Sequence, residues 1–166
     1  VMQLAQVKRD WQVSEGEDRY RRALYTYFWR SSPYPFLRTF DGPDANTACT
    51  RRNRSNTPLQ ALTLLNDEVF VECADALAKR MLTAAGADDD QARLRSGFRL
   101  SLAREPEGAE LARLEQLLAE VGAATADAAV AAGRAAARAG TQTEPLPAWR
   151  SVARVLLNLD EFITRE

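Results

Sequence analysis

The chain has 166 residues, of which 46% are apolar and 27% charged, so it has the composition of a globular protein and can bury a core. Its net charge of −1 argues against a general binder of nucleic acid or of anionic membranes, and no apolar run reaches the ~18 residues of a membrane span. It contains no histidine, which excludes Ser-His-Asp and Cys-His catalysis, histidine-ligated zinc and c-type haem attachment within these residues.

Helical periodicity begins after residue 16. Four apolar side chains recur at i, i+4, i+7 and i+8 and predict an amphipathic helix: Tyr20, Leu24, Tyr27 and Phe28. This helix should stop before Pro33, because a residue that precedes proline avoids the helical region. Aromatic side chains at this spacing are expected in the core. Tyr25 and Trp29 should point away from the buried stripe, toward the following loop or another part of the protein, and exposed aromatics here would offer a sugar-stacking platform.

Residues 31–56 are predicted to form one long loop, since prolines and the turn sequence Asp41-Gly42-Pro43 interrupt any helix. Loops of this length in compact domains are usually functional or disordered. The aromatic residues of the loop favour an ordered conformation.

The clearest helix start follows the loop. Thr57 and Gln60 have the spacing of a capping box, and Pro58 stands at the first helical position. The expected apolar face comprises Leu59, Leu62 and Leu65. A new cap at Asn66 or Asp67 should then begin a helix over 68–83, whose apolar stripe is Val69, Phe70, Cys73, Leu77 and Met81.

Three more helices are expected. Asp88–Asp90 should precede one that buries Leu94, Phe98 and Leu102 and ends before Pro106. The next spans about 107–121, and the last begins near Pro147. Its inward residues should be Trp149, Val152, Val155, Leu156, Leu159 and Phe162. Between them, the Ala- and Pro-rich segment 123–146 is expected to be a variable insert, a marginal helix or a mobile stretch.

No segment alternates as a strand does. The sequence therefore predicts a mainly α fold: an irregular array of about five to six helices with one long ordered loop, within a single helical domain or lobe over residues 1–166. Its two cysteines, Cys49 and Cys73, could form a disulfide or remain separate thiols.

The basic cluster of the loop is the leading candidate site. Arg51, Arg52 and Arg54 could bind a sulfate, a carboxylate or an acidic glycan, because guanidinium groups match oxyanions. The competing interpretation is structural: these arginines would pair with Asp41, Asp44 or Asp67 and fix the loop. Trp29 and Tyr25 complete the candidate binding residues.

The acidic residues suggest two further kinds of site. Paired carboxylates among Asp41, Asp44, Asp67, Glu68 and Glu72 could hydrolyse a glycosidic bond, which requires a defined separation. Asp41, Asp44 and Asn46 could bind calcium, although their spacing does not fit an EF-hand loop. Neither pattern is specific, so no catalytic residue and no metal site is predicted.

The segment Arg51–Asp67 resembles the C-terminal part of the planctomycete-type domain of unknown function 1553. Three other segments are similar to the same family: Asp18–Arg30, Phe40–Asp44 and Leu156–Phe162. The resemblance implies a large secreted or envelope-associated bacterial protein in which a sister domain, and often a cytochrome-c-like domain, precede this one. Any haem would belong to another domain, and no cofactor is expected here. Some members occur beside sulfatases and polysaccharide-degradation genes.

These observations together favour a non-catalytic structural or interaction lobe, a C-terminal fragment of a larger extracytoplasmic protein whose partners are its upstream domains. The alternative is a lobe that binds a carbohydrate or anion, as part of a polysaccharide-degrading enzyme completed by upstream residues. Nucleic acid is not an expected partner.

Overall fold

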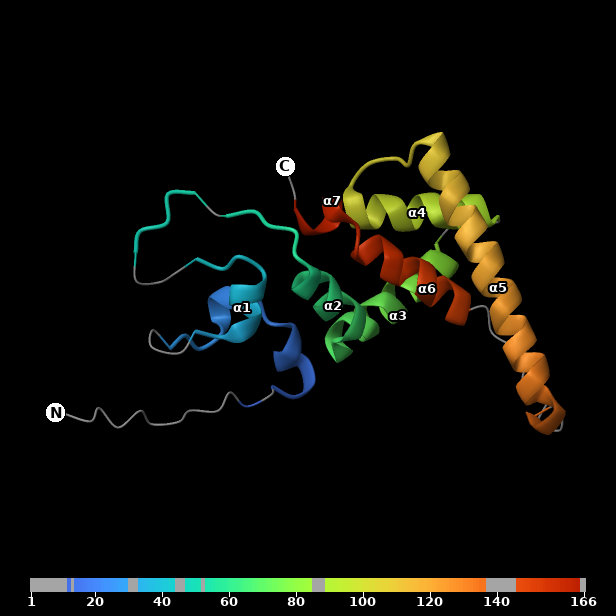
Figure 1. Cartoon of the computed structure of the whole chain (residues 1–166), viewed down its shortest axis with the longest axis horizontal. Helices are drawn as coiled ribbons and strands as arrows, with labels where there is room; N and C mark the ends of the chain where they lie inside the picture. Colours follow the sequence, from blue (N-terminus) through green and yellow to red (C-terminus); the bar gives the residue numbers. More distant parts are fainter. Residues whose placement is uncertain are drawn as a thin grey trace. The chain divides into compact units, whose positions relative to one another are not determined.

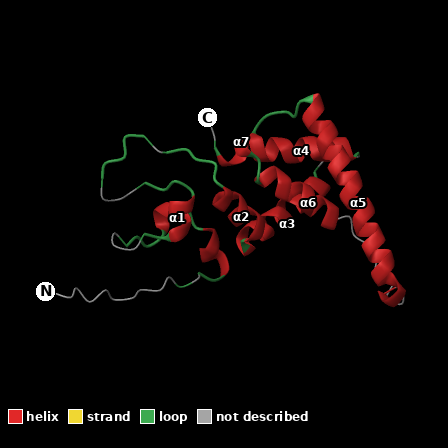
Figure 2. Cartoon of the chain, in the orientation of Figure 1, coloured by secondary structure: helices red, strands yellow, loops and turns green. Residues whose placement is uncertain are grey.

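The computed structural model describes residues 12, 14–29, 33–43, 47–51, 53–84, 89–136 and 146–164, with the backbone alone for 126–136. Within these ranges the regular elements are helices and no strand occurs (Figures 1 and 2), which confirms the predicted mainly α fold class. No helix in the described ranges is both long enough and apolar enough to cross a membrane. The chain divides into two compact units, residues 1–60 and 61–166. That both form one lobe stays a prediction.

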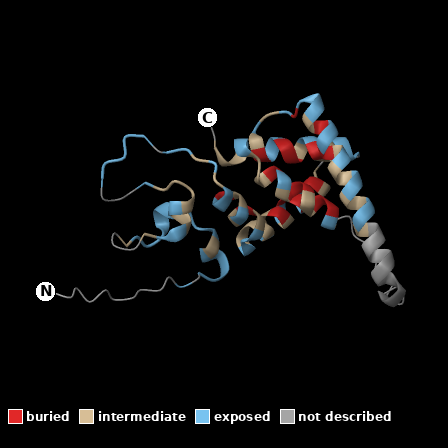
Figure 3. Cartoon of the chain, viewed as in Figure 1, coloured by how far each residue is buried: buried red, intermediate tan, exposed pale blue. Residues whose placement is uncertain are grey.

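The second unit contains the apolar core. Its helices are α3 (Glu68–Leu82), α4 (Asp90–Leu102), α5 (Gly108–Ala136), α6 (Leu146–Leu157) and α7 (Asp160–Ile163). Helix α6 contacts the other four and packs most extensively on α3. Figure 3 shows the buried residues gathered on α3, α4 and α6.

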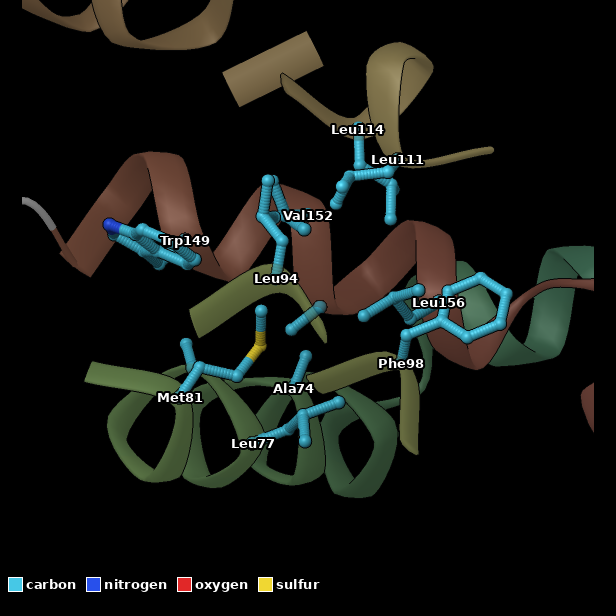
Figure 4. Packing of buried hydrophobic residues seen from close by; sticks show 12 residues of the cluster. Ala74, Leu77, Met81, Leu94, Phe98, Leu111, Leu114, Trp149, Val152 and Leu156 are labelled. Atoms are coloured by element: carbon cyan, nitrogen blue, oxygen red, sulfur yellow. The ribbon is translucent and has the colours of Figure 1, made fainter. Parts of the chain in front are cut away.

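Close packing of these helices removes a continuous set of side chains from water. In Figure 4, Met81 and Leu77 of α3 lie below α6, whose Val152 and Leu156 point into the same space. The core comprises Ala74, Leu77, Met81, Leu94, Phe98, Leu111, Leu114, Trp149, Val152 and Leu156, together with Ala78 and Ala153. The predicted burial of Leu94 and Phe98 on α4 and of most of the inward residues of α6 is thus confirmed, and Leu102 is partly buried against this core.

Side-chain caps begin two of these helices: of the two caps predicted for α3, Asp67 is the one seen, and Asp89, from the acidic run expected before α4, caps that helix. The Asp67 carboxylate accepts a hydrogen bond from the Val69 amide at 2.9 Å, and that of Asp89 accepts one from the Ala92 amide at 2.6 Å. Each cap satisfies a backbone N–H that has no partner inside the helix. Helix α4 ends at Ala103, which has a left-handed conformation (φ 59°).

Two expectations about this unit were wrong. Helix α5 does not end near residue 121 but continues to Ala136, because alanine has the highest helix propensity and no proline interrupts the segment. In α6, Val155 is exposed and Ala153 is buried, because α6 is enclosed by several helices and small side chains fit where they approach closely. That residues 123–146 form a variable insert stays a prediction.

Helix α2 (Pro58–Asn66) begins with the predicted capping box. The Thr57 amide donates to Oε1 of Gln60 at 2.8 Å, and the Gln60 amide donates to Oγ1 of Thr57 at 3.3 Å. The predicted apolar face was wrong, however: Leu59 and Leu62 are exposed, whereas Gln60 and Leu64 are buried. Gln60 is buried because its side-chain amide takes part in a hydrogen-bond network described below.

The first unit contains little regular structure. The amphipathic helix expected over residues 20–28 does not form. In its place are two 3₁₀ turns, η1 (Gly16–Tyr20) and η2 (Ala23–Tyr25), separated by extended backbone at Arg21 and Arg22. An amphipathic stripe gains most of its helical stability by packing against a core, and these side chains are exposed.

A short helix, α1 (Pro35–Thr39), lies inside the predicted loop. After it, the described residues from Phe40 to Thr57 contain no helix or strand, as expected of a long loop. Helix α1 ends through a hydrogen bond of 2.5 Å from the Gly42 amide to the Leu37 carbonyl, with Asp41 in the left-handed conformation (φ 55°). A Cβ on Gly42 would lie 2.5 Å from the Leu37 carbonyl oxygen, so this turn requires glycine.

Candidate functional site

An open pocket of about 370 Å³ lies beside the C-terminal end of α1. Arg38 and Asp41 contribute to it from the end of the helix, and the loop segment that follows contributes Arg51. The remaining lining residues are Gly42, Pro43, Thr47, Ala48, Cys49, Thr50 and Asn53. Hydroxyl, amide and charged groups therefore dominate its surface.

Asp41 occupies the wall of this pocket in a fixed orientation. Its Oδ2 accepts hydrogen bonds from the amide and from the hydroxyl of Ser55, both at 2.7 Å. The left-handed backbone of Asp41 places the side chain there, and the two hydrogen bonds fix the position of its carboxylate. The structural role expected of Asp41 is thus seen, but its partner is Ser55 rather than an arginine.

Gln60 extends this network to α1. It is only 1% exposed, and its Nε2 donates to the Thr39 carbonyl at 2.9 Å and to the Ser55 hydroxyl at 3.2 Å. A buried amide with all its groups hydrogen-bonded holds neighbouring backbone segments firmly. The network therefore fixes the end of α1, one wall of the pocket and the start of α2 relative to one another.

The three predicted arginines have different positions. Arg51 lines the pocket and is exposed, whereas Arg54 is exposed outside the lining, and Arg52 lies outside the described residues. Among the described residues, neither Arg51 nor Arg54 forms an ion pair. Asp44 also lies outside the described residues, so its predicted role stays a prediction.

Tyr25 and Trp29, the predicted aromatic members of the site, do not line this pocket. Tyr25 is 66% exposed, and Trp29 is half-buried. The ring of Trp29 lies edge-on to that of Tyr27, with centroids 5.7 Å apart and an interplanar angle of 87°. They therefore belong to the aromatic segment, residues 16–29, which has no residue in common with the pocket lined by Arg38 and Arg51, the arginine pocket.

Three of the acidic residues that could serve catalysis lie at the start of α3. Asp67 caps α3, and Glu68 and Glu72 follow it on that helix. In the part of the chain that the structure describes, no three His, Cys, Asp or Glu side chains are grouped to hold a metal ion. Asn46, like Asp44, is outside the described residues.

Both cysteines are free thiols. Cys49 is exposed in the pocket wall, and its Sγ donates to the Arg51 carbonyl at 3.5 Å. Cys73 is half-buried on α3, where burial and the nearby carboxylates of Glu72 and Asp67 raise the pKa of its thiol. A raised pKa leaves less of the reactive thiolate, so Cys73 is poorly suited to nucleophilic chemistry.

Arg38 is the charged pocket residue that the sequence did not point to; the neutral lining residues Thr47, Thr50 and Asn53 were not predicted either. Arg38 stands in the last turn of α1, a helix too short and too close to two prolines to be predicted. The available signal was a basic residue at the end of a helical segment, where the helix dipole favours positive charge.

Comparison with known proteins identifies a family. The model of a family described as "Protein of unknown function (DUF1553)", PSD1, matches residues 1–118. The matched range contains both the arginine pocket and the aromatic segment, whereas the similar segment Leu156–Phe162 lies beyond it. Searches of curated proteins and of solved structures found no match.

Proposed function

The chain belongs to the DUF1553 family of proteins of unknown function, and from this premise we propose that it is a non-catalytic interaction lobe. In this proposal, residues 16–29 dock on another domain of the same large extracytoplasmic bacterial protein. The family resemblance supports the location and the presence of sister and cytochrome-c-like domains. The docking role is supported by the surface of residues 16–29.

The observation that carries the proposal is a segment rich in exposed apolar side chains. Leu24 is 78% exposed, Tyr27 69% and Tyr25 66%, and Tyr20 and Phe28 are also exposed. Within the described part of residues 1–60, Gln60 alone is classed as buried, so these side chains have no apolar core of their own. Several large apolar side chains exposed along one short segment suit an interaction site.

Charged residues interspersed with the apolar ones give the segment the mixed character of an interface. Arg21 pairs with Asp18 at 2.6 Å, and the Arg19 guanidinium lies 5.9 Å from the centre of the Tyr20 ring. Interfaces combine aromatic residues at the centre with a polar rim, and Tyr, Trp and Arg contribute most of the binding energy. Permanent interfaces are the more hydrophobic class, which favours a domain of the same polypeptide over a transient partner.

Hydrogen exchange in the full-length protein tests this proposal. Peptides covering residues 16–29 should exchange slowly, because docking protects their amides from solvent. The double variant Leu24→Asp, Tyr27→Asp should expose them and raise their exchange rate at least tenfold, since it places two charges in an apolar interface.

Leu100→Asp is the matched control, because Leu100 is an exposed leucine on α4 in the second unit. It should leave exchange of residues 16–29 unchanged. If residues 16–29 of the unaltered full-length protein exchange as fast as an unstructured peptide, they are not docked and the proposal is wrong.

A further inference from the structure

The pocket beside α1 has an excess of positive charge. Arg38 and Arg51 contribute two guanidinium groups, and neither forms an ion pair with another described residue. Asp41 contributes one carboxylate, whose Oδ2 is already bound to the amide and hydroxyl of Ser55. The described lining residues therefore carry a net charge of +1, which suits a ligand with a single negative charge.

The neutral lining residues indicate which other groups the ligand should carry. Thr47, Thr50 and Asn53 present hydroxyl and amide groups that can both donate and accept hydrogen bonds. Such groups match hydroxyls rather than apolar surface. The volume of about 370 Å³ is at the lower end of the range of small-molecule sites, ~300–1,000 Å³, so it accommodates a ligand about the size of one sugar residue.

We propose that this pocket binds a small hydroxylated acid, a sugar unit that carries one carboxylate or sulfate group. The guanidinium groups of Arg38 and Arg51 bind the oxyanion, for which their forked donors are well matched. Thr47, Thr50 and Asn53 bind the hydroxyls. This goes beyond the docking role proposed above and does not depend on it, because the pocket and the segment 16–29 have no residue in common.

Hydrogen bonds hold one side of the pocket, the end of α1 with Asp41 and Ser55. The Gly42–Leu37 hydrogen bond ends α1 beside Arg38, and the Asp41–Ser55–Gln60 network holds the following loop. A pre-organised site loses less conformational entropy on binding than a flexible one. Both arginines are exposed and lie outside this network, so replacing them should leave the fold intact.

Titration calorimetry with the full-length protein at low ionic strength tests the proposal. Glucuronate and glucose 6-sulfate are the probes, and neutral glucose and inorganic sulfate are the comparisons. At least one acidic sugar should bind, glucose should not, and affinity should fall as salt screens the charges. Arg38→Gln and Arg51→Gln should each weaken binding at least tenfold without lowering the melting temperature.

Arg54→Gln is the matched control, since Arg54 belongs to the same loop but does not line the pocket. It should bind as the unaltered protein does. Absence of binding to both acidic sugars, or an equal loss in Arg54→Gln and Arg51→Gln, would overturn the proposal. If inorganic sulfate binds as tightly as the acidic sugars, the sugar hydroxyls add nothing to the affinity, and that part of the proposal is wrong. None of these results bears on the exchange rate of residues 16–29, so the two proposals can fail separately.

Discussion

Arg104 joins three helices of the second unit through its guanidinium group. It donates to both carboxylate oxygens of Glu110 on α5, at 2.9 and 2.8 Å, and to both of Glu161 on α7, at 2.8 and 2.6 Å. The same group lies 4.8 Å from the centre of the Phe98 ring of α4. A guanidinium that binds two carboxylates and an aromatic face is a geometry that lysine cannot reproduce.

Because of these ion pairs, the free energy of unfolding should change with pH in the acidic range. Hydrogen bonds from Arg104 hold the pKa of Glu110 at about 2 and lower that of Glu161, compared with 4.5 for a free glutamate. A pKa lowered in the folded state adds stability above pH 4.5, which is lost as the pH falls toward 2. All three side chains are partly exposed, so solvent screening keeps the contribution modest.

Glu110→Gln tests this at the residue scale. The variant should unfold at a lower temperature than the unaltered protein at pH 6, and the difference should shrink as the pH falls from 4.5 to 2.5. Glu120→Gln, on the exposed side of α5, should give no such convergence. Melting curves of Glu110→Gln and of the unaltered protein that stay equally separated across this range would contradict the expectation.

At the scale of elements, α3 and α4 approach closely because Gly97 has no side chain. A Cβ at this position would lie 2.5 Å from Cε and 2.6 Å from Sδ of Met81, which is fully buried. Glycine inside a helix costs about 1 kcal/mol relative to alanine, so the close approach must offset that cost.

Gly97→Ala should therefore fail to stabilise the protein even though alanine favours the helix. Met81 is fully buried among packed side chains, so its flexible end has little room to move aside. Overpacking of about 1–3 kcal/mol should then outweigh most or all of the gain of about 1 kcal/mol in helix propensity. In the Met81→Ala background the added methyl group enters vacated space, so the same substitution should stabilise. Denaturant unfolding of the four proteins in this cycle measures both effects. An equal effect of Gly97→Ala in both backgrounds would show that Met81 is not the cause.

Helix α6 also makes polar contacts with other helices. Its Arg150 forms an ion pair with Asp75 of α3, with a second contact at 3.0 Å, and its Arg154 donates to the Leu65 carbonyl at the end of α2. Cations that bind the last carbonyls of a helix replace hydrogen bonds the helix cannot make itself. These contacts join residues 75 and 89 positions apart in the sequence, and no local pattern predicts them.

At the scale of the whole molecule, apolar burial is concentrated in the second unit. Its core extends through four helices, whereas the described part of the first unit buries Gln60 through hydrogen bonds rather than apolar contacts. Because the burial of apolar surface drives cooperative folding, the main unfolding transition should belong to residues 61–166.

Leu94→Ala tests where that stability originates. Leu94 is fully buried, so its truncation should cost about 2–5 kcal/mol in the free energy of unfolding. Leu100→Ala, on the exposed side of the same helix, should stay within about 0.5 kcal/mol. Thermal or denaturant unfolding of the two variants provides the comparison, and similar losses in both would show that α4 is not packed as described.

The sequence by itself determined the features that depend on neighbours along the chain. The mainly α class, the capping box of Thr57 and Gln60, the caps at Asp67 and Asp89, and the stripe of α4 all follow from spacing and from unpaired backbone groups at helix ends. Turn signals and clustered charge, which are visible locally, point to Asp41 and Arg51; both line the pocket, and their role in binding stays a prediction.

Only the tertiary structure decided what depends on distant residues. In the structure, the periodic segment after residue 16 forms 3₁₀ turns, because an amphipathic sequence is stable as a helix only where its apolar face packs against another surface. The tertiary structure paired Asp41 with Ser55 rather than with an arginine, buried Gln60, and brought Arg38 to the pocket beside Arg51. Burial and hydrogen bonding between distant segments arise from three-dimensional packing, which spacing along the chain does not encode.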